Sequence, residues 1–137
     1  MEITNCLFCR IIKGEIKVHL AAENDYCLAF LDINPASQGH TLIITKKHYE
    51  NIIQVEQNDW NNLLPILSEV TSKLKKSFQP QGFNFISNMG EMAYQSIFHF
   101  HLHIIPKYQW GKGFTWTVRN NEQIFDLAQI AKKIESK

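Results

Sequence analysis

The most regular pattern in the chain is FHFHLHIIP, residues 98–106, in which histidines alternate with apolar side chains. Successive side chains of a β-strand point to opposite faces of its sheet, so a period of two predicts a half-buried strand. The expected core face carries Phe98, Phe100, Leu102 and Ile104, and the other face carries His99, His101 and His103. A merely solvated face usually carries lysine, glutamate or threonine, so three imidazoles there indicate chemistry.

Shorter patterns predict four elements before this strand. Residues 6–13 have the spacing of a short amphipathic helix, which Gly14 ends. The runs 27–32 and 39–47 are strand-like, and the turn signal Asn34-Pro35 lies between them. Residues 83–87 form a further short strand-like run after Gly82.

Two longer segments have helical periodicity. A helix that begins at Asn58 or Asp59 and ends near Ser77 would bury apolar residues spaced i, i+3, i+4, i+7. These residues are Trp60, Leu63, Leu64, Leu67, Val70 or Thr71, Leu74 and Phe78. Pro65 breaks the rule and predicts a kink or a later start. A second helix is expected from Asn121 to about Lys133, with Ile124, Leu127, Ile130 or Ala131, and Ile134 facing inward.

This order of elements predicts an α+β fold with hairpin-joined, antiparallel strands rather than alternating βαβ units. At 137 residues the chain is expected to form a single domain. Its motifs lie in residues 1–109, and residues 110–137 would supply a C-terminal loop and helix.

Charge and composition narrow the class of function. The net charge of +1 gives no basic surface for nucleic acid or for a membrane. No apolar run approaches the roughly 20 residues that span a bilayer, and MEITNCLFCR lacks the apolar region of a signal peptide. Three cysteines argue against a disulfide framework. A cytoplasmic protein is therefore expected.

The three alternate histidines cannot share one metal ion. A strand rises about 3.3 Å per residue, so the backbones of His99 and His103 would lie roughly 13 Å apart. Two nitrogens on one zinc ion are only about 4 Å apart. The imidazoles must therefore have different tasks.

CLFC, residues 6–9, is either half of a metal site or a redox pair, and no thioredoxin-like pattern accompanies it. Tetrahedral zinc would need two more ligands, for which His48 and one of the outer histidines are the natural candidates. Alternatively, Cys6 and Cys9 are small buried hydrophobes and His48 is a surface residue.

The middle histidine, His101, is the best candidate nucleophile because a neutral imidazole keeps one nitrogen free. Ser96 and Gln95, just upstream, supply a hydroxyl and an amide suited to an anionic oxygen. Phe30 and Asp32 share one face of the strand-like run 27–32 and could hold a base and a ribose. The alternative interpretation is that Phe30 belongs to the core and Asp32 starts the Asn-Pro turn.

His-φ-His-φ-His-φ-φ, where φ is apolar, resembles the signature of the histidine triad (HIT) family of nucleotide hydrolases and transferases. The resemblance covers about residues 4–109, including CLFCRIIKGEI, CLAFLDINPASQGHTLIITKKH and NMGEMAYQSIFHFHLHIIPKY. It implies a five-stranded antiparallel sheet with helices, assembled as a homodimer. It also implies a purine nucleotide substrate, which is attacked at the α-phosphorus to form a nucleotidyl-histidine that water cleaves.

The resemblance assigns roles to individual residues. It implies that His101 is the nucleophile, helped by His103, and that Ser96 and Gln95 contact the phosphate and the leaving group. Asn88 matches a phosphate-side residue and His40 a histidine near the site. The nucleoside-binding residues would be Asp32 for the ribose and Phe8, Ile11, Phe30 and Ile33 for the base. In a metal-containing branch, Cys6, Cys9, His48 and His99 would hold a structural zinc ion. Tyr94 departs from the glycine that many members carry.

The leading hypothesis is thus a nucleoside phosphoramidase or dinucleoside polyphosphate hydrolase. Two alternatives stay open at this stage. One is a purine nucleotide-binding or partner-binding module in which hydrolysis is incidental. The other is a metallohydrolase with a zinc centre built from histidines.

Overall fold

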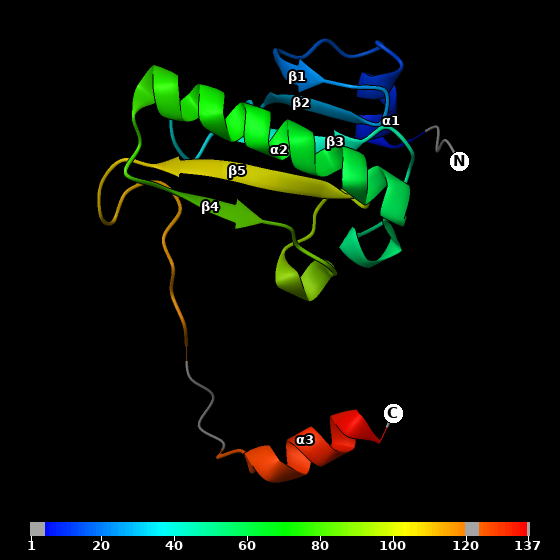
Figure 1. Ribbon diagram of the computed structural model, residues 1–137, viewed down its shortest axis with the longest axis vertical. Helices are drawn as coiled ribbons and strands as arrows, with labels where there is room; N and C mark the ends of the chain where they lie inside the picture. The colour runs from blue at the N-terminus through cyan, green and yellow to red at the C-terminus, as the bar shows by residue number, and fades with distance from the viewer. Residues whose placement is uncertain (1–4, 120–123, 137) are drawn as a thin grey trace.

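The computed structural model describes residues 5–119 and 124–136 and contains one five-stranded antiparallel sheet (Figure 1). The strands are ordered β1-β2-β3-β5-β4. Their bounds are β1 Leu20–Glu23, β2 Cys27–Leu31, β3 Thr41–Thr45, β4 Gly82–Ile86 and β5 His101–Lys107. The predicted α+β class is confirmed. The residue patterns alone missed β1, which is four residues long and pairs with β2 through an irregular register.

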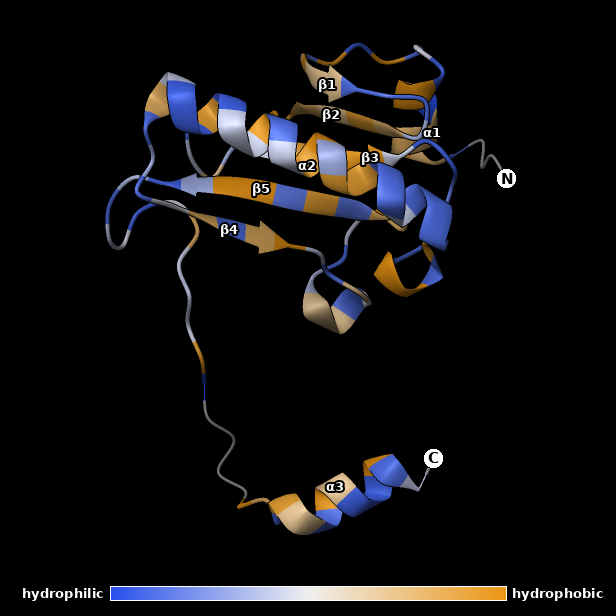
Figure 2. Ribbon diagram, in the orientation of Figure 1, coloured by the Kyte–Doolittle hydropathy of each residue, from blue (hydrophilic) through white to orange (hydrophobic). Residues whose placement is uncertain are grey.

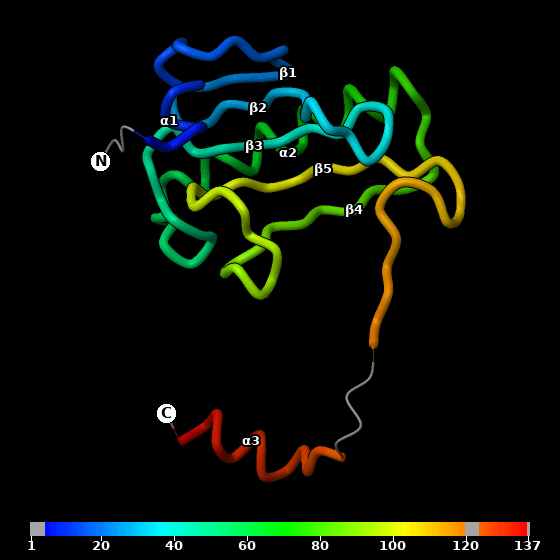
Figure 3. Tube along the Cα trace, turned by 180° about the vertical axis from the view of Figure 1, so that it is seen from behind, coloured from blue at the N-terminus to red at the C-terminus, as the bar shows by residue number. Residues whose placement is uncertain are grey.

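Helices cover both faces of the sheet. The long helix α2 (Gln57–Phe78) lies across one face, and the short helix α1 (Leu7–Ile12) packs on the other, as the front and back views show (Figures 1 and 3). Two short 3-10 turns, η1 (Ile52–Gln54) and η2 (Glu91–Ala93), lie in connecting loops, and α3 (Leu127–Glu135) follows β5. The sheet therefore separates two apolar clusters.

Helix α2 packs on the sheet through a row of buried side chains, which are Leu63, Ile66, Val70 and Leu74. The prediction of a later start at Pro65 is wrong, because the helix begins at Gln57 and includes Pro65 on its exposed side. The predicted apolar row was wrong for Leu64 and Phe78, which are exposed. Ile66 is buried in their place.

Strand β5 begins at His101, three residues later than the apolar pattern predicts. The backbone N–H of Phe100 donates to the carbonyl of Tyr49 instead of joining a neighbouring strand. Phe100 still faces the α2 side and is buried, whereas Phe98 is 45% exposed and not in the core. His101 and His103 lie opposite Ile44 and Leu42 of β3, on the α1 side.

Helix α3 lies apart from the sheet (Figure 1), and hydrophobic residues occupy part of its surface (Figure 2). Its predicted start at Asn121 lies outside the described residues, and it extends to Glu135 rather than Lys133. The side chains expected to face inward, Ile124, Leu127, Ile130 and Ile134, are all exposed. That part of the prediction is wrong for the chain taken by itself, while the single domain of residues 1–137 stays a prediction.

No helix among the described residues is long and apolar enough to cross a membrane.

Candidate functional site

The α1 face of the sheet carries a pocket of about 500 Å³, which we call the nucleoside pocket after the ligand that the sequence analysis expects there. Its apolar wall includes Phe8 and Ile11 of α1 and Phe30 of β2, all buried. His101 and His103 line it from β5. A volume of this size is typical of small-molecule sites. The expected base-binding residue Ile33 also lines the pocket, with its side chain largely exposed.

Beside this pocket, Cys6, Cys9, His48 and His99 converge so that their ligand atoms all lie within 4.8 Å of one another. The Sγ atoms of Cys6 and Cys9 lie 3.4 and 3.6 Å from Nδ1 of His99. Nδ1 of His48 lies 3.3 Å from Sγ of Cys9 and 3.1 Å from Nδ1 of His99. Tetrahedral ligands on zinc lie roughly 3.3–3.8 Å apart, given bonds of about 2.0–2.3 Å. The four residues therefore fit a zinc ion.

The tautomer of His99 suits metal binding. Its Nε2–H donates to the backbone carbonyl of Thr45 at 2.7 Å, so Nδ1 carries no proton and directs its lone pair at the cluster. Burial lowers the pKa of His99 to about 4, which keeps the ring neutral. Two thiolates and two neutral imidazoles would balance the charge of Zn²⁺. The third cysteine, Cys27, lies apart, and burial raises its pKa to about 12.

The middle histidine is oriented by the backbone of His99, a residue of the Cys/His cluster. Nδ1–H of His101 donates to the backbone carbonyl of His99 at 2.8 Å, which leaves Nε2 as the nitrogen with a free lone pair. Burial lowers the pKa of His101, so the imidazole is neutral at pH 7. The ring of Phe8 stands edge-on to it, with ring centroids 5.1 Å apart. His101 thus has the protonation state of a nucleophile.

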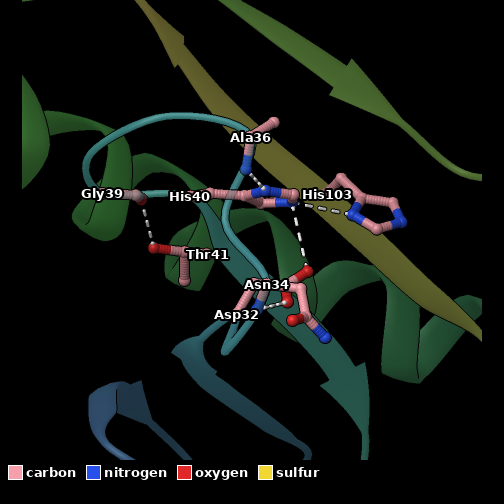
Figure 4. Close-up of polar contacts among 7 residues, drawn as sticks. All are labelled: Asp32, Asn34, Ala36, Gly39, His40, Thr41 and His103. Carbon is pink, nitrogen blue, oxygen red and sulfur yellow. Dashed lines mark hydrogen bonds and ion pairs between the residues drawn. The ribbon is translucent and has the colours of Figure 1, made fainter. Parts of the chain in front are cut away.

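The third histidine is oriented by a chain of hydrogen bonds (Figure 4). The backbone N–H of Ala36 donates to Nδ1 of His40 at 3.0 Å, so the proton of this ring sits on Nε2. That Nε2–H donates to Nδ1 of His103 at 2.9 Å. His103 therefore carries its own proton on Nε2, the nitrogen that points away from His40 (Figure 4). Burial lowers the pKa of His103 to about 4, and its Nε2–H is a neutral hydrogen-bond donor.

Asp32 follows β2 and has two tasks. Its Oδ1 accepts the N–H of Asn34 at 2.8 Å, which is the turn-starting role that the alternative interpretation gave it. Its Oδ2 lies 3.5 Å from Nε2 of His40, and the residue lines the nucleoside pocket. Asp32, His40 and His103 are also close enough to hold a cation. Both nitrogens of His40 are already occupied by hydrogen bonds, so we assign no metal to that group.

The loop before β5 places the remaining predicted residues. Ser96, Asn88 and Tyr94 line the nucleoside pocket. Gln95 is buried, with its Oε1 accepting from Gly90 N–H and its Nε2 donating to the carbonyls of Glu50 and Ile97. The structure gives this amide the task of holding the loop, and its contact with phosphate stays a prediction.

Tyr94 has a φ of 69°, a left-handed conformation that glycine adopts readily and that costs other residues roughly 1–2 kcal/mol. This backbone geometry favours glycine, the residue that the family resemblance implies at this position.

The residues that sequence reasoning missed act through their backbones. Thr45 supplies the carbonyl for His99, and Ala36 supplies the N–H for His40. Glu50 supplies the carbonyl that fixes Gln95. Every residue has a backbone carbonyl and every residue except proline has an N–H, so no residue type could have signalled them.

Comparisons with known proteins agree with this geometry. The model of the HIT domain matches residues 13–110, which include His40, His48 and all three triad histidines, while Cys6 and Cys9 precede it. An uncharacterised HIT-like protein of Mycoplasma genitalium is 40% identical over 134 residues, covering 94% of this chain and 95% of that protein. The adenosine 5'-monophosphoramidase of Schizosaccharomyces pombe is 39% identical over 114 residues, covering 82% and 83%.

A crystal structure of a HIT family protein from Bacillus anthracis superposes with a TM-score of 0.87 at 36% identity and covers 97% of this chain and 96% of that one. The domain match, the curated relatives and the shared fold agree with the triad geometry. The chain belongs to the HIT family.

Proposed function

We propose that this protein is a nucleotide hydrolase that attacks the α-phosphorus of purine nucleoside phosphoramidates or dinucleoside polyphosphates and releases a nucleoside monophosphate. One observation carries the proposal, namely that His101 gives its Nδ1–H to the carbonyl of His99 and keeps Nε2 free in the nucleoside pocket. The S. pombe relative, named as an adenosine 5'-monophosphoramidase, supports the same reaction class.

The reaction proceeds by two displacements at phosphorus. Nε2 of His101 forms a bond to the α-phosphorus as the bond to the leaving nitrogen or oxygen breaks, and the leaving atom takes up a proton from solvent. The oxygen of a water molecule then bonds to phosphorus as the bond from phosphorus to Nε2 of His101 breaks, and the water gives a proton back to solvent. Nε2–H of His103 and the hydroxyl of Ser96 donate to the charged oxygens, while Asp32 binds the ribose and Phe8 and Phe30 enclose the base.

Release of AMP from an adenosine phosphoramidate tests this proposal. We expect His101→Ala to lower kcat by at least about a thousandfold, as loss of a covalent nucleophile does. His19→Ala, at an exposed histidine outside the pocket, is the matched control. Turnover by His101→Ala at the wild-type rate would disprove the nucleophile. Tight AMP binding without turnover by the wild type would favour the binding-module alternative.

We also propose that Cys6, Cys9, His48 and His99 hold a structural zinc ion. When bound, the metal would tie α1 to the segment before β5 and supply no water activation. Cys9→Ser is expected to lose the metal, measured as zinc per chain, whereas Cys27→Ser keeps it because Cys27 lies outside the cluster. Zinc that survives Cys9→Ser but is lost in His101→Ala would instead support the metallohydrolase.

Finally, we propose that the protein is a homodimer. The exposed apolar side chains of α3 support this, because an amphipathic helix is stable when its apolar face is covered.

A further inference from the structure

A second hollow, of about 370 Å³, adjoins the nucleoside pocket, and we call it the side pocket. Leu7, Ser96 and Ile97 line both hollows, so they form a shared wall. Beyond this wall the polar lining of the side pocket includes Asn5, Glu50 and His48. The two hollows therefore meet at Ser96, where a substrate bound in the nucleoside pocket would border the side pocket.

The position of Ser96 relates this second space to the reaction. In a displacement at phosphorus, the attacking and leaving atoms lie roughly in line on opposite sides of the phosphorus. His101 lines only the nucleoside pocket, whereas Ser96 lines both the nucleoside pocket and the side pocket. A phosphate held between Nε2 of His101 and the hydroxyl of Ser96 would direct its leaving group across the shared wall.

The described lining of the side pocket includes the carboxylate of Glu50. Its described lining contains no lysine or arginine, and Glu50 is the acidic residue in it. The carboxylate of Glu50 makes no ion pair with the described residues. Cys6 and His48 belong to the zinc cluster, which would be neutral when occupied. A carboxylate that lines a pocket and makes no ion pair with the described residues favours a cation there.

The backbone of Glu50 is fixed relative to the reaction centre. Its carbonyl accepts from Nε2 of the buried Gln95 at 2.7 Å, and its N–H donates to Oε1 of Gln54 at 2.7 Å. Gln95 directly precedes Ser96 in the chain. The residue whose buried amide fixes the backbone of Glu50 is thus the chain neighbour of Ser96.

We infer that the side pocket receives the leaving group and that Glu50 selects leaving amines that carry a second, positively charged group. This inference rests on the proposed function and names the substrate class for it. The phosphorus–nitrogen bond still breaks as Nε2 of His101 bonds to phosphorus, and the freed amine nitrogen takes up a proton. The charged group of the amine takes no part in the bond changes and contributes only binding.

Three AMP phosphoramidates with equal carbon chains test the inference. Their amines are diaminobutane, butylamine and aminobutanoate, which end in a cation, a methyl group and an anion. We expect kcat/KM to fall in that order, by roughly two- to fivefold at each step, because a partly exposed ion pair is weak. The differences should shrink as salt is added.

Variants that change the charge at position 50 test whether Glu50 causes the differences in kcat/KM among the three substrates. Glu50→Gln is expected to abolish the differences among the three substrates, and Glu50→Lys to reverse their order. Glu69→Gln removes a carboxylate from α2, on the opposite face of the sheet, and should leave the order unchanged. Equal kcat/KM values for the three substrates, or a cation preference that persists in Glu50→Gln, would overturn the inference. No AMP from any of the three would instead refute the proposed function.

Discussion

Three histidines of the site owe their tautomers to backbone groups. Carbonyl oxygens of Thr45 and His99 fix the protons of His99 and His101, and an N–H of Ala36 fixes that of His40. A carbonyl can only accept and an N–H can only donate, so each contact permits one neutral tautomer. Three chemically identical side chains are thereby prepared for the different roles that we propose: a metal ligand, a nucleophile and a link that orients His103.

The hydrogen bond from His40 to His103 leads to a prediction about the rate of AMP release. His40→Ala removes the donor to Nδ1 of His103, so His103 can adopt the other tautomer and lose its donor toward phosphate. We expect kcat for AMP release to fall about tenfold, the worth of roughly one hydrogen bond. His19→Ala is the control. An unchanged kcat in His40→Ala would show that the hydrogen bond from His40 to His103 does not support the reaction.

The buried His103 also predicts how stability depends on pH. Burial, with His101 and His40 nearby, lowers its pKa from 6.5 to about 4. Between these values the unfolded chain binds a proton that the folded chain does not, so stability falls as the pH drops. In urea unfolding at about pH 7 and pH 5, His103→Asn should show a smaller fall than the wild type. Zinc release would affect both proteins, so an equal fall in both would contradict the prediction.

At the scale of elements, the turn from β2 to β3 carries His40, and Gly39, the residue before it, packs closely against α2 and β5. Gly39 has a φ of +90°, and a Cβ there would lie 2.8 Å from Cδ2 of Leu74 in α2 and 3.4 Å from Cγ of Pro106 in β5. The turn that carries His40 is therefore set against both a helix and a strand.

Gly39→Ala is expected to lower the free energy of unfolding by about 1–3 kcal/mol, through crowding and the positive φ. Gly82→Ala is the control, because Gly82 begins β4 with open space around its Cα and no positive φ. Its effect should stay within about 0.5–1 kcal/mol. Denaturant unfolding measures both variants, and equal losses would show that the close packing at Gly39 carries no cost.

Local patterns in the sequence predicted the elements that follow one period. Leu102 and Ile104 share the buried face of β5, and Cys27 and Ala29 that of β2, as their alternation requires. The four metal-site residues predicted from CLFC, His48 and the triad do converge. The pattern failed where a distant backbone group decides, since the carbonyl of Tyr49 takes the N–H of Phe100 and delays β5. It also missed β1, which is too short for a detectable alternation.

At the scale of the whole molecule, helix α3 is the element whose apolar side chains the sheet does not cover. Its periodicity was predicted correctly, but periodicity tells which residues share a face and not which surface covers them. Leu127, Ile130 and Ile134 are exposed on the described chain. A second copy of the chain is the covering surface that we propose.

Sedimentation of the full chain tests this assembly. We expect a dimer for the wild type and at least about a tenfold weaker dimer for Ile130→Asp, because a charge would enter an apolar contact. Gln129→Asp adds the same charge one residue away on the polar side of the helix and should leave the dimer intact. A monomeric wild type, or equal dimer affinity in both variants, would contradict the proposal.

The contact between Ala36 and His40 has a consequence for how this protein can diverge. Only the main-chain N–H of Ala36 takes part, so selection on this contact acts on the shape of the turn and hardly on the side chain at position 36. Most substitutions there would pass unnoticed, whereas proline, which has no N–H, would leave His40 without its partner. The hydrogen bond that orients His40 can thus be kept while the amino acid at position 36 changes.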